Sequence, residues 1–107
     1  MKKALVPIFV FLISTGSQCI PAKESDIVQA CKLYESLAEV IMEARQKGAP
    51  MSGLYTRDYG TKERNEITKK IIIEAYDIPR FNSDQSKKDA VRNFKNDKFL
   101  FCIKNAK

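Results

Sequence analysis

The first 22 residues constrain the fold most, because they are expected to be removed from the chain. Lys2 and Lys3 precede an apolar run of ten residues, 4–13, and a short stretch of small polar residues follows. This order of charge, apolar core and small residues is typical of a secretory signal peptide. A run of ten apolar residues is also too short for a transmembrane helix, which needs about 20. We therefore expect an exported chain with a signal peptide over 1–22 and one small domain over 23–107.

The cleavage position depends on small residues one and three positions before the cut, and two positions qualify. Cleavage after Ser17 has the better pair of small residues, with Ser17 directly before the cut and Thr15 three positions before it. Cleavage after Ala22 removes Cys19 and leaves an even number of cysteines, which an oxidising compartment favours, so we prefer it. Two alternatives stay open. One is an uncleaved anchor, and the other is a lipidated Cys19, against which the large Gln18 before it argues.

Removing 22 of the 107 residues leaves 85, enough for one domain with a thin core. With Lys2 and Lys3 gone, this domain carries 17 basic and 13 acidic residues, a net charge of +4. No arginine-rich stripe with interleaved aromatic residues occurs, so no nucleic-acid partner is predicted; contact with an anionic membrane stays open without being predicted. Histidine is absent, which removes His-based general bases, Ser-His and Cys-His couples and histidine metal sites. We therefore predict no catalytic residue, no metal ligand, no cofactor and no enzymatic activity.

Apolar residues three and four positions apart predict a core-facing helix over 26–47. Asp26 is expected to cap it with Gln29 as a capping-box partner, and Gly48 with Pro50 beyond is a stop signal. The expected core face holds Ile27, Ala30, Cys31, Tyr34, Leu37, Ala38, Ile41 and Ala44.

Two shorter helices are expected next. Ser52 is the predicted cap of a short helix that passes through Tyr59 and ends at Gly60. Thr61 begins a third helix, which stops before Pro79 because the residue before a proline is pushed out of the helical region. Its expected core face holds Ile67, Ile71, Ile72, Ala75 and Tyr76.

The segment 77–82 is predicted to be a linker that packs down, since it carries two large apolar side chains. A fourth helix follows, with Asn82 or Ser83 as its cap and an end near Ile103. The run 99–103 is apolar all round, which indicates either deep burial of the last turn or a short strand, and we prefer the helix. The pattern predicts an all-α bundle of about four helices. The core side of the last one is expected to hold Val91, Phe94, Phe101 and Cys102.

Cys31 and Cys102 lie on the core faces of the first and last predicted helices, so they can face each other. In an oxidising compartment we predict a disulfide between them, with two buried free thiols as the alternative. The closed loop has 72 residues, and the chain-entropy model gives roughly 4 kcal/mol of stabilisation for it. No Cys-x-x-Cys motif occurs, so redox catalysis is not predicted.

Two groups of side chains are candidates for binding. Glu35, Glu39 and Glu43 stand four residues apart on the expected outer side of the first helix; we interpret them as a solvated row, the alternative being a site for a cation or a basic partner. The segment 52–81 combines tyrosine and arginine, which anchor protein interfaces, although an aromatic core covered by arginines has the same composition. The candidate interaction surface consists of Tyr55, Arg57, Tyr59, Tyr76, Arg80 and Phe81.

The segments 44–48 (Ala-Arg-Gln-Lys-Gly) and 75–81 (Ala-Tyr-Asp-Ile-Pro-Arg-Phe), with Ser52 between them, carry a resemblance. Over roughly 31–102, the chain resembles small exported proteins of unassigned function from Gram-negative bacteria and their prophages. In size, leader and single disulfide it is more loosely similar to the HdeA-type acid-stress chaperones of the periplasm. The resemblance implies periplasmic residence and a mobile-element origin, and it implies no catalytic or binding residue.

These features predict a periplasmic or secreted protein of the binding or accessory type, which recognises a protein of the cell envelope. The alternative is a holdase-like acid-stress chaperone, because 13 carboxylates would neutralise near pH 4 and leave 17 positive charges to repel one another. A small envelope hydrolase is a third class. The sequence leaves the oligomeric state open.

Overall fold

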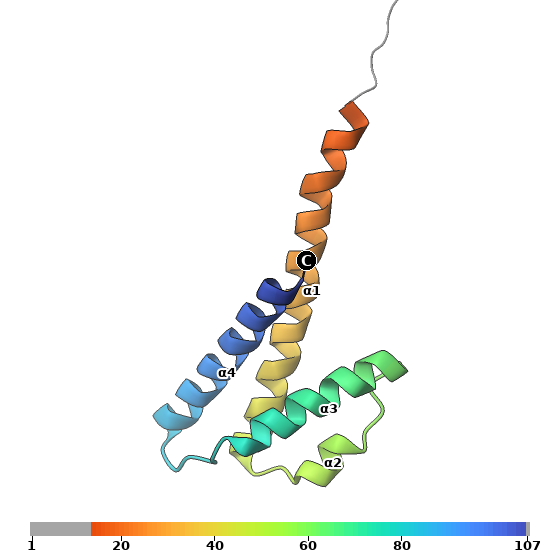
Figure 1. Ribbon diagram of the computed structural model, residues 1–107. Coiled ribbons are helices and arrows are strands. Elements are labelled where there is room, and N and C mark those ends of the chain that lie inside the picture. The colour runs from red at the N-terminus through yellow and green to blue at the C-terminus, as the bar shows by residue number, and fades with distance from the viewer. Residues whose placement is uncertain (1–13, 107) are drawn as a thin grey trace, which may run out of the picture.

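The computed structural model describes residues 14–106, with side chains from residue 24 onward. This part of the chain contains four helices and no strand, so the predicted all-α bundle is confirmed. In Figure 1, α4 lies along α1, whereas α3 leaves the lower end of α1 on the other side with α2 beneath it. The helices are α1 (Ser14–Lys47), α2 (Met51–Tyr55), α3 (Lys62–Asp77) and α4 (Asp84–Asn105).

The first helix begins earlier than predicted. It starts at Ser14 rather than after Asp26, which lies exposed inside the helix and caps nothing. The residues just before Asp26 tolerate helical geometry, so helix propagation carries the element through them. Residues 1–13 of the expected signal peptide lie outside the described residues, and cleavage after Ala22 would remove the first nine residues of α1. The C-terminal stop is confirmed, because α1 ends at Lys47 and Gly48 adopts a φ of +90°.

The predicted cap of the short helix is wrong. Pro50 is the N-cap of α2 and Ser52 lies inside the helix, with no side chain capping this end. A proline with φ of −69° already has the backbone geometry that starts a helix, so the helix begins one residue before Ser52. The helix ends at Tyr55, which leaves Tyr59 outside it.

The caps of the two longer helices agree with the sequence. The Thr61 hydroxyl accepts a hydrogen bond from the Arg64 backbone N–H (3.1 Å), and α3 ends before Pro79. Of the two candidate caps for α4, the structure selects Ser83, whose hydroxyl accepts from the Ser86 backbone N–H (3.0 Å).

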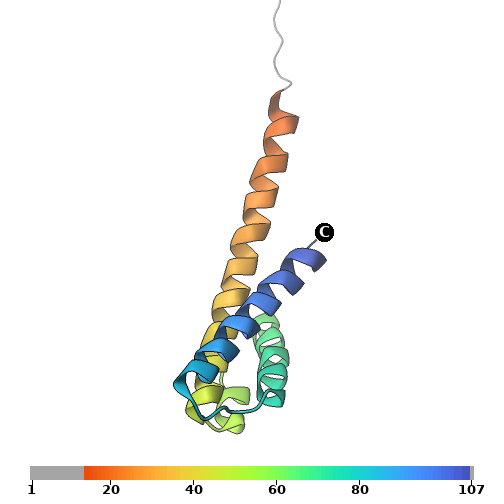
Figure 2. The same ribbon diagram turned by 90° about the vertical axis from the view of Figure 1, so that its left-hand side faces the viewer.

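The core lies where α1, α3 and α4 meet. Its buried residues are Ala38, Ile41, Met42, Ile71, Ile72, Ala75, Ala90 and Phe94. Three residues assigned to core faces are exposed instead, namely Ala30, Ile67 (45 %) and Phe101 (55 %). For Ala30 and Ile67 the reason is visible in Figure 1, where the start of α3 lies away from α1 and leaves the facing parts of both helices uncovered. Phe101 is exposed although the C-terminal end of α4 (marked C in Figure 2) is tied to α1 by the Cys31–Cys102 disulfide. Met42 and Thr68, outside those faces, are fully buried.

The last turns of α4 are helical, as preferred, but they are not deeply buried. Leu100 and Phe101 are more than half exposed, which corrects the expected burial of 99–103. The predicted disulfide is confirmed at this end of the bundle, where Cys31 and Cys102 are joined with their Cα atoms 5.6 Å apart. It ties the end of α4 to α1 in a region where few other side chains are covered.

Candidate functional site

The Tyr76 side chain is used to close the lower end of the bundle. Its hydroxyl donates a hydrogen bond to the Ala49 carbonyl (2.5 Å), and the Arg45 guanidinium lies 4.9 Å from the centre of its ring. Burial raises the pKa of the Tyr76 hydroxyl, and the nearby positive charge of Arg45 lowers it by less. This tyrosine therefore fixes the turn after α1.

Arg80 caps the C-terminus of α1. Its Nε donates to the Gln46 backbone carbonyl (2.9 Å), and its guanidinium also reaches the Lys47 carbonyl (3.4 Å). Carbonyls in the last turn of a helix have no intrahelical partner, and a cation suits the negative end of the helix dipole. The charge of Arg80 is thus used inside the fold.

A polar clasp holds the linker between α3 and α4 against α1. The side chain of Gln46 accepts from the Phe81 backbone N–H (2.9 Å) and donates to the Pro79 carbonyl (2.9 Å). Arg45 adds a bond from its Nε to the Ile78 carbonyl (3.0 Å). We call these contacts of Arg45 and Gln46 with 78–81 the linker clasp.

The linker clasp joins the two segments on which the resemblance rests, 44–48 and 75–81. Gln46 is only 2 % exposed, although sequence analysis assigned it no role. A glutamine in the last turn of a helix, with a proline-containing linker later in the chain that carries large apolar residues, is the signal that could have indicated this buried role. The two segments therefore have a structural use in this chain.

The two remaining tyrosines of the candidate interaction surface are Tyr55, at the end of α2, and Tyr59, just after it. The Lys69 ammonium lies 5.2 Å from the centre of the Tyr55 ring. Tyr59 donates from its hydroxyl to the Leu54 carbonyl (2.7 Å), and its backbone N–H donates to the Asn65 side chain (2.6 Å). Both rings are half-buried.

The structure thus divides the candidate interaction surface into two groups. Tyr76, Arg80 and Phe81 lie at the end of α1, and the other three lie on and after α2. Among them, Arg57, Arg80 and Phe81 are exposed. Most of the polar groups in this set bond within the chain.

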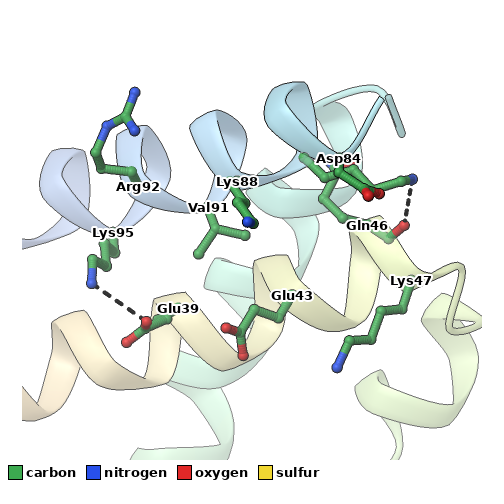
Figure 3. A pocket seen from close by; sticks show the side chains of 10 residues that line it. Glu39, Glu43, Gln46, Lys47, Asp84, Lys88, Val91, Arg92 and Lys95 are labelled. Carbon is green, nitrogen blue, oxygen red and sulfur yellow. Dashed lines mark hydrogen bonds and ion pairs between the residues drawn. The ribbon is translucent and has the colours of Figure 1, made fainter. Parts of the chain in front are cut away.

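A charged groove of about 430 Å³ runs between α1 and α4 (Figure 3). Glu39 and Glu43 form the α1 side, and the basic residues opposite them come from α4. The Lys95 ammonium lies 3.4 Å from a Glu39 carboxylate oxygen, as the dashed line shows. Its basic residues on α4 are Lys87, Lys88, Arg92 and Lys95.

This arrangement leaves most of the glutamate row solvated, as interpreted. The Glu39 side chain is 38 % exposed although it pairs with Lys95, Glu43 is exposed, and Glu35 is half-buried outside the groove. Glu39 and Glu43 face the basic side of α4, so the basic groups nearest to them belong to the same chain. An exposed pair of this kind contributes at most about 1 kcal/mol.

A second groove, of about 360 Å³, lies between the middle of α1 and the start of α3. Its volume is in the range of ligand and side-chain pockets. We call it the α1–α3 groove. Leu33 on one wall is 69 % exposed and Ile67 on the other is 45 % exposed. The lining residues are Ala30, Leu33, Tyr34, Leu37, Tyr59, Arg64, Ile67 and Thr68.

Two hydroxyls lie at this groove. Burial raises the pKa of the Tyr34 hydroxyl. The Thr68 hydroxyl is buried and has no hydrogen-bond partner. Tyr59 is the member of the candidate interaction surface that also lines this groove. The groove therefore combines exposed aliphatic walls with few polar groups.

Comparison of the chain with known protein families, curated proteins and solved structures found no match. In the part of the chain that the structure describes, the protein is a small helical bundle that carries the Cys31–Cys102 disulfide and the two grooves described above. Within residues 14–106, no helix has the length and hydropathy needed to cross a membrane. No group of three potential metal ligands occurs in that same part of the chain.

Proposed function

We propose that this protein is an exported binding protein of the cell envelope, which recognises a protein partner by accepting an apolar helix in the α1–α3 groove. Export is supported by the leader pattern and by a disulfide, which persists in oxidising compartments. The resemblance to exported prophage proteins extends the proposal to a mobile-element origin.

The observation that carries the proposal is the exposure of large aliphatic side chains on both walls of one groove. Leu33 and Ile67 come from different helices, and the space between them is lined mainly by apolar atoms. A contiguous exposed apolar patch in a groove often marks an interaction site, whereas apolar residues scattered singly over a surface do not. An amphipathic helix fits such a groove because its apolar side chains recur on one face.

Capture from an envelope extract tests the proposal. The tagged protein should retain a discrete partner, and Leu33→Lys or Ile67→Lys should abolish capture by placing a charge on a groove wall. Leu100→Lys is the matched control, since Leu100 is 52 % exposed on α4 and lies outside the groove. Equal capture by wild type and both groove variants, with circular dichroism showing all of them folded, would overturn the proposal.

One observation favours a second candidate, an acid-opened chaperone. Two ion pairs hold α4 to its neighbours, Lys95 with Glu39 of α1 and Lys98 with Glu74 of α3. Protonation of the two carboxylates in acid removes both attractions and leaves the lysines charged. At pH 2 this candidate requires loss of the near-UV dichroism signal and binding of a hydrophobic dye. Retention of near-UV dichroism without dye binding excludes it.

A further inference from the structure

One side of α1 carries a regular strip that the fold covers only in part, since Leu37 at its centre also packs against the core. The residues occur at alternating spacings of four and three, which is the repeat of a helix seam that packs against another helix. Leu33 and Val40 are 69 % and 61 % exposed, and Leu37 is half-buried. The strip consists of Asp26, Ala30, Leu33, Leu37, Val40, Ala44 and Lys47.

We propose that a second copy of this chain docks on this strip through its own α1, with the two helices antiparallel. The inference rests on the proposed function and specifies the helix that the α1–α3 groove accepts. Leu33 and Leu37 belong both to the strip and to the groove lining, so the two features form one surface.

The strip is complementary to itself when it is reversed about Leu37. In that arrangement Leu37 meets Leu37 of the second copy, Leu33 meets Val40, and the small residues Ala30 and Ala44 meet at the ends. The Leu37 pair lies on the two-fold axis and occurs once, and every other contact occurs twice, as in an isologous interface. Large residues thus face large ones at the centre, where burial contributes most.

The charges at the two ends select the antiparallel direction. Asp26 of one copy lies opposite Lys47 of the other, and both residues are exposed on the described chain. A parallel pair would bring two Asp26 carboxylates together at one end and two Lys47 ammonium groups at the other. Like charges opposed across an interface are unfavourable, whereas opposite charges fix the register.

The body of α4 lies away from the centre of this strip, although Lys47 at the end of the strip also lines the charged groove between α1 and α4. Glu39 and Gln46, which face α4, lie nearly on the opposite side of α1 from the strip. The strip spans 22 residues, about 32 Å of helix at 1.5 Å per residue. Ile67 on α3 stands beside it and would pack on the incoming helix.

Sedimentation equilibrium of the purified protein is the first test. Wild type should form a dimer, and Val40→Lys should be monomeric, because it places a charge against Leu33 of the second copy; Val40 is 61 % exposed, so the fold itself tolerates this change. Asp26→Lys should weaken association about tenfold, and the double variant Asp26→Lys with Lys47→Asp should restore it. The matched control is Lys32→Asp, an exposed charge change off the strip that should leave the dimer intact.

Engineered cysteines test the direction of the helices. Leu37→Cys should form a disulfide between copies. Ala30→Cys should cross-link to Ala44→Cys in a mixture of the two variants but not to itself. Self-linking of Ala30→Cys would show a parallel pair and overturn the arrangement.

Two outcomes separate this inference from the proposed function. A protein that stays monomeric at all concentrations, while Leu33→Lys still abolishes capture of another envelope protein, overturns the second copy as the occupant and keeps the groove as the site. A monomer whose capture of envelope proteins is unaffected by Leu33→Lys overturns both.

Discussion

The Gln46 side chain accepts a hydrogen bond from the Phe81 backbone N–H at 2.9 Å, across 35 positions of sequence. The same side chain donates to the Pro79 carbonyl, so one buried amide satisfies two backbone groups of the linker. The Lys87 ammonium of α4 adds a further contact here, since it donates a hydrogen bond to the Gln46 backbone carbonyl (2.9 Å). The linker clasp therefore determines where α4 starts relative to α1.

Replacing Gln46 by Leu should destabilise the protein by about 2 to 4 kcal/mol, because the Phe81 N–H and the Pro79 carbonyl both lose their partner. Urea unfolding followed by circular dichroism measures the change. The matched control is Gln85→Leu, which removes an exposed amide bonded only to Asp89 and should change the free energy of unfolding by less than about 0.5 kcal/mol. Equal effects of the two changes would contradict the structural role of Gln46.

Two threonines of the third helix region should respond in opposite directions to the same substitution. Thr68→Val removes a buried hydroxyl that has no partner, and should stabilise the protein by about 1 kcal/mol. Thr61→Val removes the hydroxyl that caps α3, and should destabilise it by about 1 kcal/mol. Thermal unfolding of both variants checks the signs; two shifts in the same direction would count against this assignment.

Two glycines should also respond in opposite directions to the same substitution, in this case to alanine. Gly48 has a φ of +90°, and an added Cβ would lie 3.1 Å from the Arg80 guanidinium carbon, so Gly48→Ala should cost about 1 kcal/mol or more. Gly53 lies within α2, with its nearest neighbour 4.0 Å away from such a Cβ. Gly53→Ala should therefore stabilise the protein by about 0.4 to 1 kcal/mol. Chemical unfolding of both variants gives the comparison.

The Cys31–Cys102 disulfide should account for a large share of the stability. The two cysteines are 71 positions apart, and replacing both by serine should lower the free energy of unfolding by about 4 kcal/mol, because the unfolded chain regains its freedom. Alkylation of the unreduced wild type, read by mass spectrometry, should label neither residue. A double variant that unfolds at the wild-type urea concentration would contradict this account.

The raised pKa of the Tyr34 hydroxyl determines how the stability of the protein should change in alkali. Burial raises its pKa above the ordinary value of 10.0, so the folded state favours the neutral form. The part of the stability that depends on the neutral hydroxyl is fully present below pH 10, and it is lost as the pH rises through the raised pKa of Tyr34. Tyr34→Phe should therefore reduce the fall in stability between pH 9.5 and 11, measured by urea unfolding at each pH. An unchanged alkaline slope would mean that this hydroxyl does not contribute.

Local features were read correctly from the sequence because they depend on neighbours in the chain. Thr61 and Ser83 cap their helices through hydrogen bonds to residues three positions on, and Gly48 ends α1 through its own backbone conformation. The early start of α1 was missed, since a cap-like Asp26 indicates a start only where the preceding residues resist helical geometry.

The sites were harder to predict, because each depends on segments far apart in sequence. The pattern of Ile67 and Phe101 fits a core face, yet both side chains are exposed. For Ile67 the reason is that the start of α3 lies away from α1 (Figure 1). The tyrosines and arginines of 52–81 indicated an interface, whereas several of their polar groups bond within the fold.

By itself, the sequence determined the helical class, the stops of α1 and α3 and the pairing of Cys31 with Cys102, since these follow from helical periodicity, backbone preferences and the count of cysteines. Only the tertiary structure decided that Gln46 is buried and that Leu33 and Val40 remain uncovered. Burial depends on which distant helix lies over a given face, and in this chain the divergence of α3 from α1 leaves one apolar side of α1 open.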